Sequence, residues 1–231
     1  MQKTYTEFLA GAKNLVFLGE PGSGKTETAL SFALGLAREG TREVHFFDMD
    51  QTKPLFRARD CGETLESEGV VFHFQYQLLD APTVPPGVGE RLADPESTVF
   101  MDVGGGSHGS HMIGQYSELL SGPDTRVLYI VNPYRPWSRN QRDIAATASR
   151  VLGAARLEHV SLVAAPNLGP HSTAGDVLEG MERIKEYLPD REPEFVCVLE
   201  RLIPEVEGKI AAPIMPIRLN TLPDWLTAGA E

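Results

Sequence analysis

Short apolar runs alternate along the chain with longer amphipathic stretches, and turn-forming residues separate the two. Runs such as V-L-Y-I-V (127–131) and S-L-V-A-A (161–165) are apolar nearly throughout, which is typical of strands covered by helices on both faces. The amphipathic stretches have the apolar spacing of helices. Strands are therefore predicted at 15–18, 43–47, 70–75, 97–101, 126–131, 159–164 and 195–199, and helices at 27–38, 57–68, 111–120, 138–152 and 173–187.

This order predicts an α/β fold with a doubly wound, mostly parallel sheet between two layers of helices. The 231 residues show neither an internal repeat nor a linker, so we expect one domain over 1–231. Residues 81–89 are Pro-rich and should be irregular, and a Pro-rich tail from about residue 204 to 231 should wrap the surface. Ligands of such sheets bind at the carboxyl ends of the strands, where the candidate side chains are found.

A phosphate-binding loop of the pattern G-x-x-x-x-G-K-T follows the first predicted strand and precedes a predicted helix, which is the context that the motif requires. Its backbone N–H groups and the start of the helix favour bound phosphate. Lys25 is expected to reach the β- and γ-phosphates, and the Thr26 hydroxyl to bind Mg²⁺. The residues predicted to hold the nucleotide here are Gly19, Glu20, Pro21, Gly22, Ser23, Gly24, Lys25, Thr26 and Glu27.

Three carboxylates follow predicted strands at the same edge of the sheet. Asp102 ends an apolar strand and is followed by Val-Gly-Gly-Gly, which predicts the Walker B role of holding Mg²⁺. Asp48 and Asp50 end the second strand; Asp48 is expected nearer the metal, and Asp50 is the candidate for orienting the attacking water. Catalysis is therefore assigned to Lys25, Asp50 and Asp102, and metal binding to Thr26, Asp48 and Asp102, with turn roles as the alternative for the aspartates.

Asn167 follows the strand predicted at 159–164, where a side-chain amide can read the edge of a base; a simple turn is the rival interpretation. The guanine signature N-K-x-D is absent from the chain, so the sequence favours adenine. His108 and His111 follow the triple glycine and are expected to be polar residues of a switch loop, with a metal site as the alternative.

Composition narrows the possible partners. The net charge of −11 disfavours binding to nucleic acid or to an anionic membrane, and no apolar run approaches the roughly 20 residues of a membrane span. Cys61 and Cys197 are the two cysteines, and their spacing fits neither a zinc ribbon nor a disulfide framework. With no signal-peptide pattern at the N-terminus, the sequence predicts a cytoplasmic protein.

The motifs together resemble the MinD/ParA/CobQ-type nucleotide-binding proteins over about residues 14–187. Segments 19–30 (GEPGSGKTETAL), 48–60 (DMDQTKPLFRARD), 131–136 (VNPYRP) and 165–173 (APNLGPHST) are similar to a little-characterised bacterial subgroup of ATP-binding proteins. The resemblance implies ATP, Mg²⁺, slow hydrolysis and often a nucleotide-bridged homodimer. It departs at Glu20, where typical members carry a signature lysine that reaches across the dimer. Substitutes in trans are sought in Arg57, Arg59 and Arg135.

The leading functional hypothesis is a slow ATPase that acts as a nucleotide-dependent switch on a protein client. Two other classes stay open. One is a small-molecule kinase or ATP-dependent ligase, for which residues 81–89 and the tail would provide pocket walls. The other is a metallochaperone ATPase whose His108 and His111 carry metal.

Overall fold

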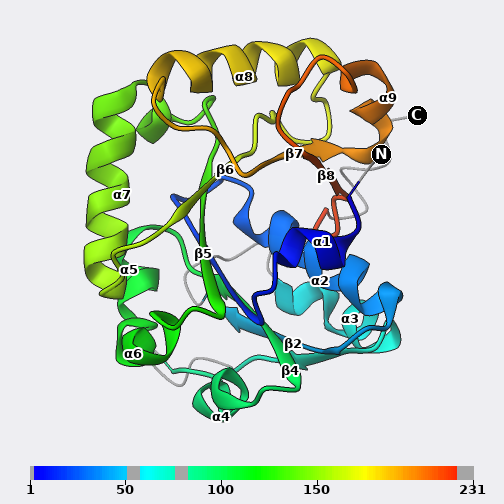
Figure 1. The fold of residues 1–231 in the computed structure, drawn as a ribbon, viewed down its shortest axis with the longest axis vertical. Helices are drawn as coiled ribbons and strands as arrows, with labels where there is room; N and C mark the ends of the chain where they lie inside the picture. Colours follow the sequence, from blue (N-terminus) through cyan, green and yellow to red (C-terminus); the bar gives the residue numbers. More distant parts are fainter. Residues whose placement is uncertain (1–2, 51–57, 76–82, 223–231) are drawn as a thin grey trace.

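Eight parallel strands form a single sheet in a computed structural model, which describes residues 3–50, 58–75 and 83–222 (Figure 1). The strand order is β3-β2-β4-β1-β5-β6-β7-β8: the chain runs from β1 to the β3 edge, returns to place β4 between β2 and β1, and then continues from β5 to the β8 edge, which confirms the predicted doubly wound α/β fold. The strands are β1 (Asn14–Leu18), β2 (Glu43–Met49), β3 (Val70–His73), β4 (Ser97–Val103), β5 (Thr125–Val131), β6 (Ser161–Ala164), β7 (Phe195–Leu199) and β8 (Ile214–Ile217).

Helices cover both faces of this sheet. One face is packed by α1 (Tyr5–Leu9), α2 (Lys25–Glu39), α3 (Gly62–Ser67), α8 (Ala174–Tyr187) and α9 (Ile203–Val206). The other face is packed by α4 (Val88–Ala93), α6 (Ser117–Leu120) and α7 (Gln141–Ala155), and α5 (Gly106–His111) lies against α7. Short 3₁₀ turns complete the connections: η1 (Ala58–Cys61), η2 (Gly114–Tyr116), η3 (Pro136–Ser138) and η4 (Glu200–Leu202).

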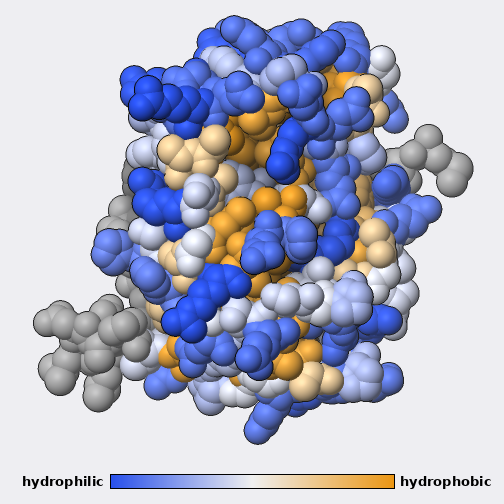
Figure 2. Space-filling view, turned by 60° about the vertical axis from the view of Figure 1, so that its left-hand side comes forward, coloured by the Kyte–Doolittle hydropathy of each residue, from blue (hydrophilic) through white to orange (hydrophobic). Residues whose placement is uncertain are grey.

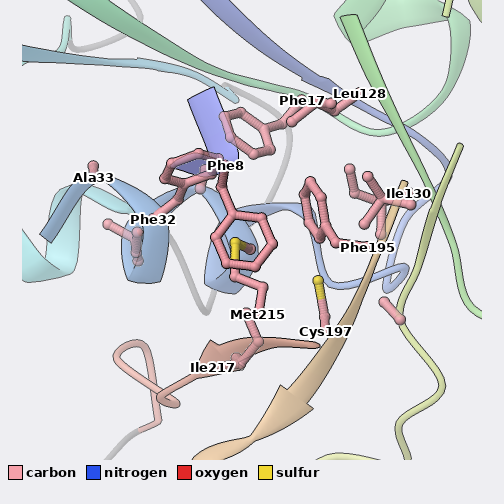
Figure 3. Close-up of a cluster of buried hydrophobic side chains, with 14 of the residues drawn as sticks. Phe8, Phe17, Phe32, Ala33, Leu128, Ile130, Phe195, Cys197, Met215 and Ile217 are labelled. Carbon is pink, nitrogen blue, oxygen red and sulfur yellow. The ribbon is translucent and has the colours of Figure 1, made fainter. Parts of the chain in front are cut away.

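The core on the α2 face contains a group of packed aromatic rings among aliphatic side chains (Figure 3). Phe32 of α2 packs edge-on against Phe100 of β4 at 5.3 Å between ring centroids, and Phe8 of α1 packs edge-on against Phe195 of β7 at 5.4 Å. Each of these rings is at least 97% buried. Rings in this arrangement add about 0.5–1.5 kcal/mol per pair to the stabilisation from burial. The packing fixes α2, and with it the phosphate loop that precedes α2.

The Pro-rich tail contains a strand that the sequence did not predict. β8 pairs with β7 in parallel, and Pro216 lies opposite Val198. Because β8 is at the edge of the sheet, no further strand pairs with its outer side. A proline there, which has no backbone N–H to donate, therefore costs no inter-strand hydrogen bond on that side. A second difference concerns α7, which is capped by Asn140 rather than by a residue at its predicted start of 138: Asn140 accepts a hydrogen bond from the Asp143 N–H.

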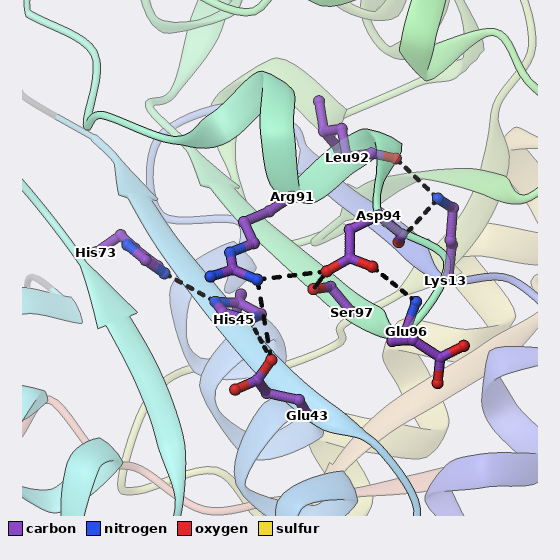
Figure 4. Close-up of polar contacts among 9 residues, drawn as sticks. All are labelled: Lys13, Glu43, His45, His73, Arg91, Leu92, Asp94, Glu96 and Ser97. Atoms are coloured by element: carbon purple, nitrogen blue, oxygen red, sulfur yellow. Dashed lines mark hydrogen bonds and ion pairs between the residues drawn. The ribbon is translucent and has the colours of Figure 1, made fainter.

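Polar groups gather around the starts of β2 and β4, together with His73 at the end of the short edge strand β3 (Figure 4). His45 of β2 lies between His73 of β3 and Glu43, at 2.9 and 3.1 Å, and Arg91 of α4 contacts Glu43 and Asp94.

On the face that carries α7, apolar surface shows in a hollow between polar side chains (Figure 2). A hollow at α7 is lined in part by Ile144, Ala148, Leu152, Leu162 and Leu188. No helix among the described residues is long and apolar enough to cross a membrane.

Candidate functional site

The phosphate loop connects β1 to α2 and places Lys25 and Thr26 in the first turn of the helix. Gly24 caps the helix at φ +101°, a left-handed conformation that glycine adopts without strain. The Lys25 side chain is buried and folds back over the loop, where its Nζ donates to the Glu20 carbonyl at 3.1 Å. The positive end of a 15-residue helix and this ammonium group therefore converge on the loop.

Oxygen ligands suited to a small hard cation meet beside the loop. The Thr26 hydroxyl donates to Asp102 Oδ2 at 2.7 Å, which joins the start of α2 to the end of β4. Asp48 of β2 is the register partner of Asp102, so the two carboxylates come from neighbouring strands. All three side chains are buried. Carboxylate and hydroxyl oxygens are the donors that Mg²⁺ selects, so this corner fits the predicted metal.

Asp48 also forms an ion pair with an arginine of the same chain. Arg59, in η1, lies 2.9 Å from Asp48 Oδ2 through its Nε and donates to the Asp50 carbonyl at 2.7 Å. Burial raises the pKa of the Asp48 carboxyl, and the Arg59 guanidinium opposes that rise. The sequence placed Arg59 among possible contacts in trans, whereas the structure places it within the site.

Asp50 lies above the loop that follows β4. Its N–H donates to Asp48 Oδ1 at 2.9 Å, and the residue is buried. A Cβ built on Gly104 would lie 3.1 Å from Asp50 Oδ1, so this carboxylate faces the turn directly after Asp102. The two predicted aspartate motifs are therefore brought together; the role of Asp50 in orienting water stays a prediction.

The turn after β4 packs directly on the phosphate loop. A Cβ on Gly105 would lie 2.7 Å from Pro21 Cγ, and one on Gly109 would lie 2.1 Å from the Gly104 carbonyl, so neither position has room for a side chain. The Gly106 N–H donates to the Gly19 carbonyl at 3.3 Å. Movement of the phosphate loop and movement of this glycine turn are thus sterically linked.

Two arginines contact the phosphate loop from other elements. Arg150 of α7 pairs with Glu20 at 2.6 Å, and Arg135, in the loop after β5, donates from Nε to the Gly22 carbonyl at 2.9 Å. Arg150 had no role in the sequence-based prediction, because nothing near it in the chain indicates its partner. Of the arginines considered as substitutes for a signature lysine, Arg135 touches the loop, Arg59 binds Asp48, and Arg57 lies outside the described residues.

A pocket opens beside Gly24, between α2 and the carboxyl ends of the strands on the β6 side. Asn167 lines it but also makes a turn: its Nδ2 donates to the Ala165 carbonyl at 3.1 Å, and its Oδ1 accepts from the Gly169 N–H at 3.3 Å. Asn167 therefore makes the turn that was the rival interpretation to base recognition, and its side chain also lines the pocket. The remaining lining residues are Glu27, Thr28, Ala165, Gly169, Cys197, Leu199, Ile217 and Leu219.

His108 and His111 lie three residues apart on α5, and both are exposed. The described part of the chain holds no group of three or more His, Cys, Asp or Glu side chains placed to bind one metal ion. The histidine pair thus has no third protein ligand among these residues.

Comparison with solved structures finds the same fold in signal recognition particle receptors. Chloroplast FtsY from Physcomitrella patens aligns with a TM-score of 0.53 at 16% identity, over 80% of this chain and 58% of that one. Cell division protein FtsY from Thermotoga maritima gives 0.51 and 15%, over 94% and 73% of the two chains. FtsY from Elizabethkingia anophelis in complex with GDP gives 0.51 and 16%, over 94% and 68%.

No family model matches the sequence, and no curated protein matches it. The fold and the phosphate loop together define an α/β protein of the P-loop NTPase type. At identities this low the structural likeness concerns the fold alone. The resemblance to MinD, ParA and CobQ proteins is carried by the motifs in the sequence and stays a prediction.

Proposed function

We propose that this chain is a Mg²⁺-dependent ATPase that works as a nucleotide-operated switch. One observation carries the proposal: Thr26 of the phosphate loop bonds Asp102 at 2.7 Å, and Asp48 lies beside Asp102 in the sheet register. Thr26 and Asp102, with Asp48 beside them, would hold Mg²⁺, whose positive charge would offset the negative charge of the phosphates. Lys25 would bind the phosphates, and Asp50 would orient the attacking water from its position over Gly104.

The pocket beside Gly24 supports adenine rather than guanine as the base. Guanine presents two neighbouring donors, N1–H and N2–H₂, which a free carboxylate recognises well. Glu27 is the carboxylate that lines this pocket, and both of its oxygens accept hydrogen bonds from Asn220 and Thr221. Asn167 offers an amide, and the other walls are largely apolar. Because one structural neighbour was solved with GDP, both nucleotides belong in the test.

Steric linkage between the phosphate loop and the glycine turn supports the switch. The terminal phosphate would contact the phosphate loop over residues 22–25. A change in those contacts would alter the position of Gly105, because Gly105 packs against Pro21 of the same loop. Loss of that phosphate on hydrolysis would release the turn and the exposed helix α5 behind it. The client would be a protein that contacts α5 or its neighbour α7 in one nucleotide state.

The test measures binding and hydrolysis of ATP and GTP by the purified chain with Mg²⁺, together with its mass in solution with ADP and with a non-hydrolysable ATP analogue. We expect ATP binding, slow turnover and loss of both in Lys25→Ala. Lys185→Ala removes an exposed lysine of α8 and serves as the matched control. Equal ATP affinity in wild type and Lys25→Ala would refute the proposal. Turnover that appears only with an added metabolite would favour the kinase or ligase instead.

A further inference from the structure

The segment after β8 lies across the first turns of α2 and is held there by two side chains of that helix. Glu27 accepts four hydrogen bonds: Oε2 from Asn220 N–H (2.7 Å) and Nδ2 (3.3 Å), and Oε1 from Thr221 N–H (3.0 Å) and Oγ1 (2.5 Å). Ser31, one turn further along α2, accepts from the Arg218 N–H at 3.1 Å and donates to its carbonyl at 3.2 Å. This segment is therefore fixed to the helix that begins at the phosphate loop.

A third contact holds the same segment from the opposite side. The Cys61 thiol of η1 donates to the Asn220 carbonyl at 3.1 Å. The backbone of Asn220 is thus bonded through its N–H to α2 and through its carbonyl to η1. A residue whose backbone N–H and carbonyl are both hydrogen-bonded to other elements has little freedom to shift.

The fixed segment continues from a wall of the nucleoside pocket. Ile217 and Leu219 line that pocket together with Glu27. Leu219 stands between two anchored neighbours, Arg218 and Asn220, so its backbone can move away from the pocket only if those hydrogen bonds break. The bonds that Glu27 accepts therefore set the width of the pocket on this side.

We propose that Glu27 is a positioning residue of the nucleoside pocket and determines affinity for the nucleoside part of the nucleotide. The inference rests on the proposed function, since it requires a nucleotide in this pocket. Glu27 directly follows Thr26, and a carboxylate there disfavours phosphate by charge. Four donors from residues 220 and 221 satisfy this carboxylate, so its role is to hold the pocket wall.

The test compares ATP with tripolyphosphate, which has the phosphates but no nucleoside. In Glu27→Gln one acceptor becomes an amide N–H₂ that faces donors of the segment, so the wall is released. We expect ATP affinity to fall about tenfold and tripolyphosphate affinity to change by less than about twofold. The ratio of the two affinities cancels the effect of removing one negative charge. Thr221→Val, which deletes only the Oγ1 bond, should shift the ratio in the same direction by less.

Glu39→Gln is the matched control. Glu39 lies at the other end of α2 and accepts hydrogen bonds from the Tyr5 and Thr6 N–H groups, so it ties down a chain segment in the same way but far from the pocket. Its variant should leave the ratio unchanged. An unchanged ratio in both Glu27→Gln and Thr221→Val, with wild type binding ATP, would overturn the inference alone. If wild type bound neither nucleotides nor tripolyphosphate, the proposed function would fall with it.

Discussion

Replacing Arg59 with methionine should destabilise the protein strongly at neutral pH, because it leaves a buried carboxylate without its cation. Arg59 Nε lies 2.9 Å from Asp48 Oδ2, and the Asp48 side chain has no exposed surface. Burial already raises the pKa of this carboxyl, and Arg59 is the group that opposes the rise most. Methionine keeps much of the packing volume of the side chain and removes the charge.

The size of the effect follows from the proton that the carboxyl must bind. Without Arg59, Asp48 avoids a buried charge by protonation, starting from an ordinary pKa of 3.8. That protonation costs about 4 kcal/mol at pH 7 and about 1.5 kcal/mol at pH 5. Removing one partner of a buried ion pair typically costs about 3–5 kcal/mol, which agrees with the neutral value. Because the folded-state pKa is raised, the loss is smallest at low pH and grows as the pH rises.

Urea unfolding at pH 7 and pH 5 measures the prediction on wild type, Arg59→Met, Asp48→Asn and the double variant. Arg59→Met should lose about 2.5 kcal/mol more at pH 7 than at pH 5, and adding Asp48→Asn should remove that difference. Arg42→Met makes the same substitution at an exposed position and should change little at either pH. A pH-independent loss in Arg59→Met, or no recovery in the double variant, would refute the reasoning.

Three further predictions concern single groups. Burial, with His45 and Arg91 nearby, lowers the pKa of His73 from 6.5 to about 4, so stability should fall as the pH drops from about 6.5 toward 4 (Figure 4). After allowance for solvent screening the loss is about 1–2 kcal/mol, and His73→Phe should remove it from the urea midpoints. Burial raises the pKa of the Cys197 thiol to about 12, so iodoacetamide at pH 8 should modify it, by mass spectrometry, only after unfolding. Arg135→Ala, which removes the bond to the Gly22 carbonyl, should lower ATP turnover about tenfold, with Arg135→Lys intermediate; unchanged turnover in both would contradict it.

Sequence periodicity predicted the strands that are apolar on both faces. β7 has the predicted bounds, Phe195–Leu199, and β1, β2, β4 and β5 start within one residue of their predictions. β8 was missed because Pro213 precedes this four-residue strand and Pro216 lies within it, and the edge position that permits a proline cannot be read from the sequence. The predicted helix 111–120 is divided in the structure. One helix, α5, begins earlier, at Gly106 in a glycine-rich run with low helix propensity, and ends at His111; η2 and α6 follow it.

The site residues that sequence analysis identified are those that belong to a motif of neighbouring residues in the chain. Thr26 and Asp102 were predicted from motifs next to strands, and the structure brings them within 2.7 Å. Arg150 was not predicted, and the tail that holds Ile217 was expected to line a pocket only in the kinase or ligase alternative. Glu20 and Arg150 are 130 positions apart, and only the packing of α7 beside the loop brings them together. Contacts of this kind depend on tertiary structure and leave no local pattern.

The Glu20–Arg150 pair bears on how a second copy could contact the phosphate loop. A lysine at position 20 would extend a cation outward, whereas the Glu20 carboxylate is 9% exposed and is neutralised within its own chain. The exposed member of the pair is Arg150, at 55%. The outer rim of the loop therefore presents guanidinium groups from α7 and, through Arg135, from the loop after β5. Among the described residues, these two arginines contact the loop from other elements, so they are the candidates for the role of a signature lysine in a nucleotide-bridged dimer.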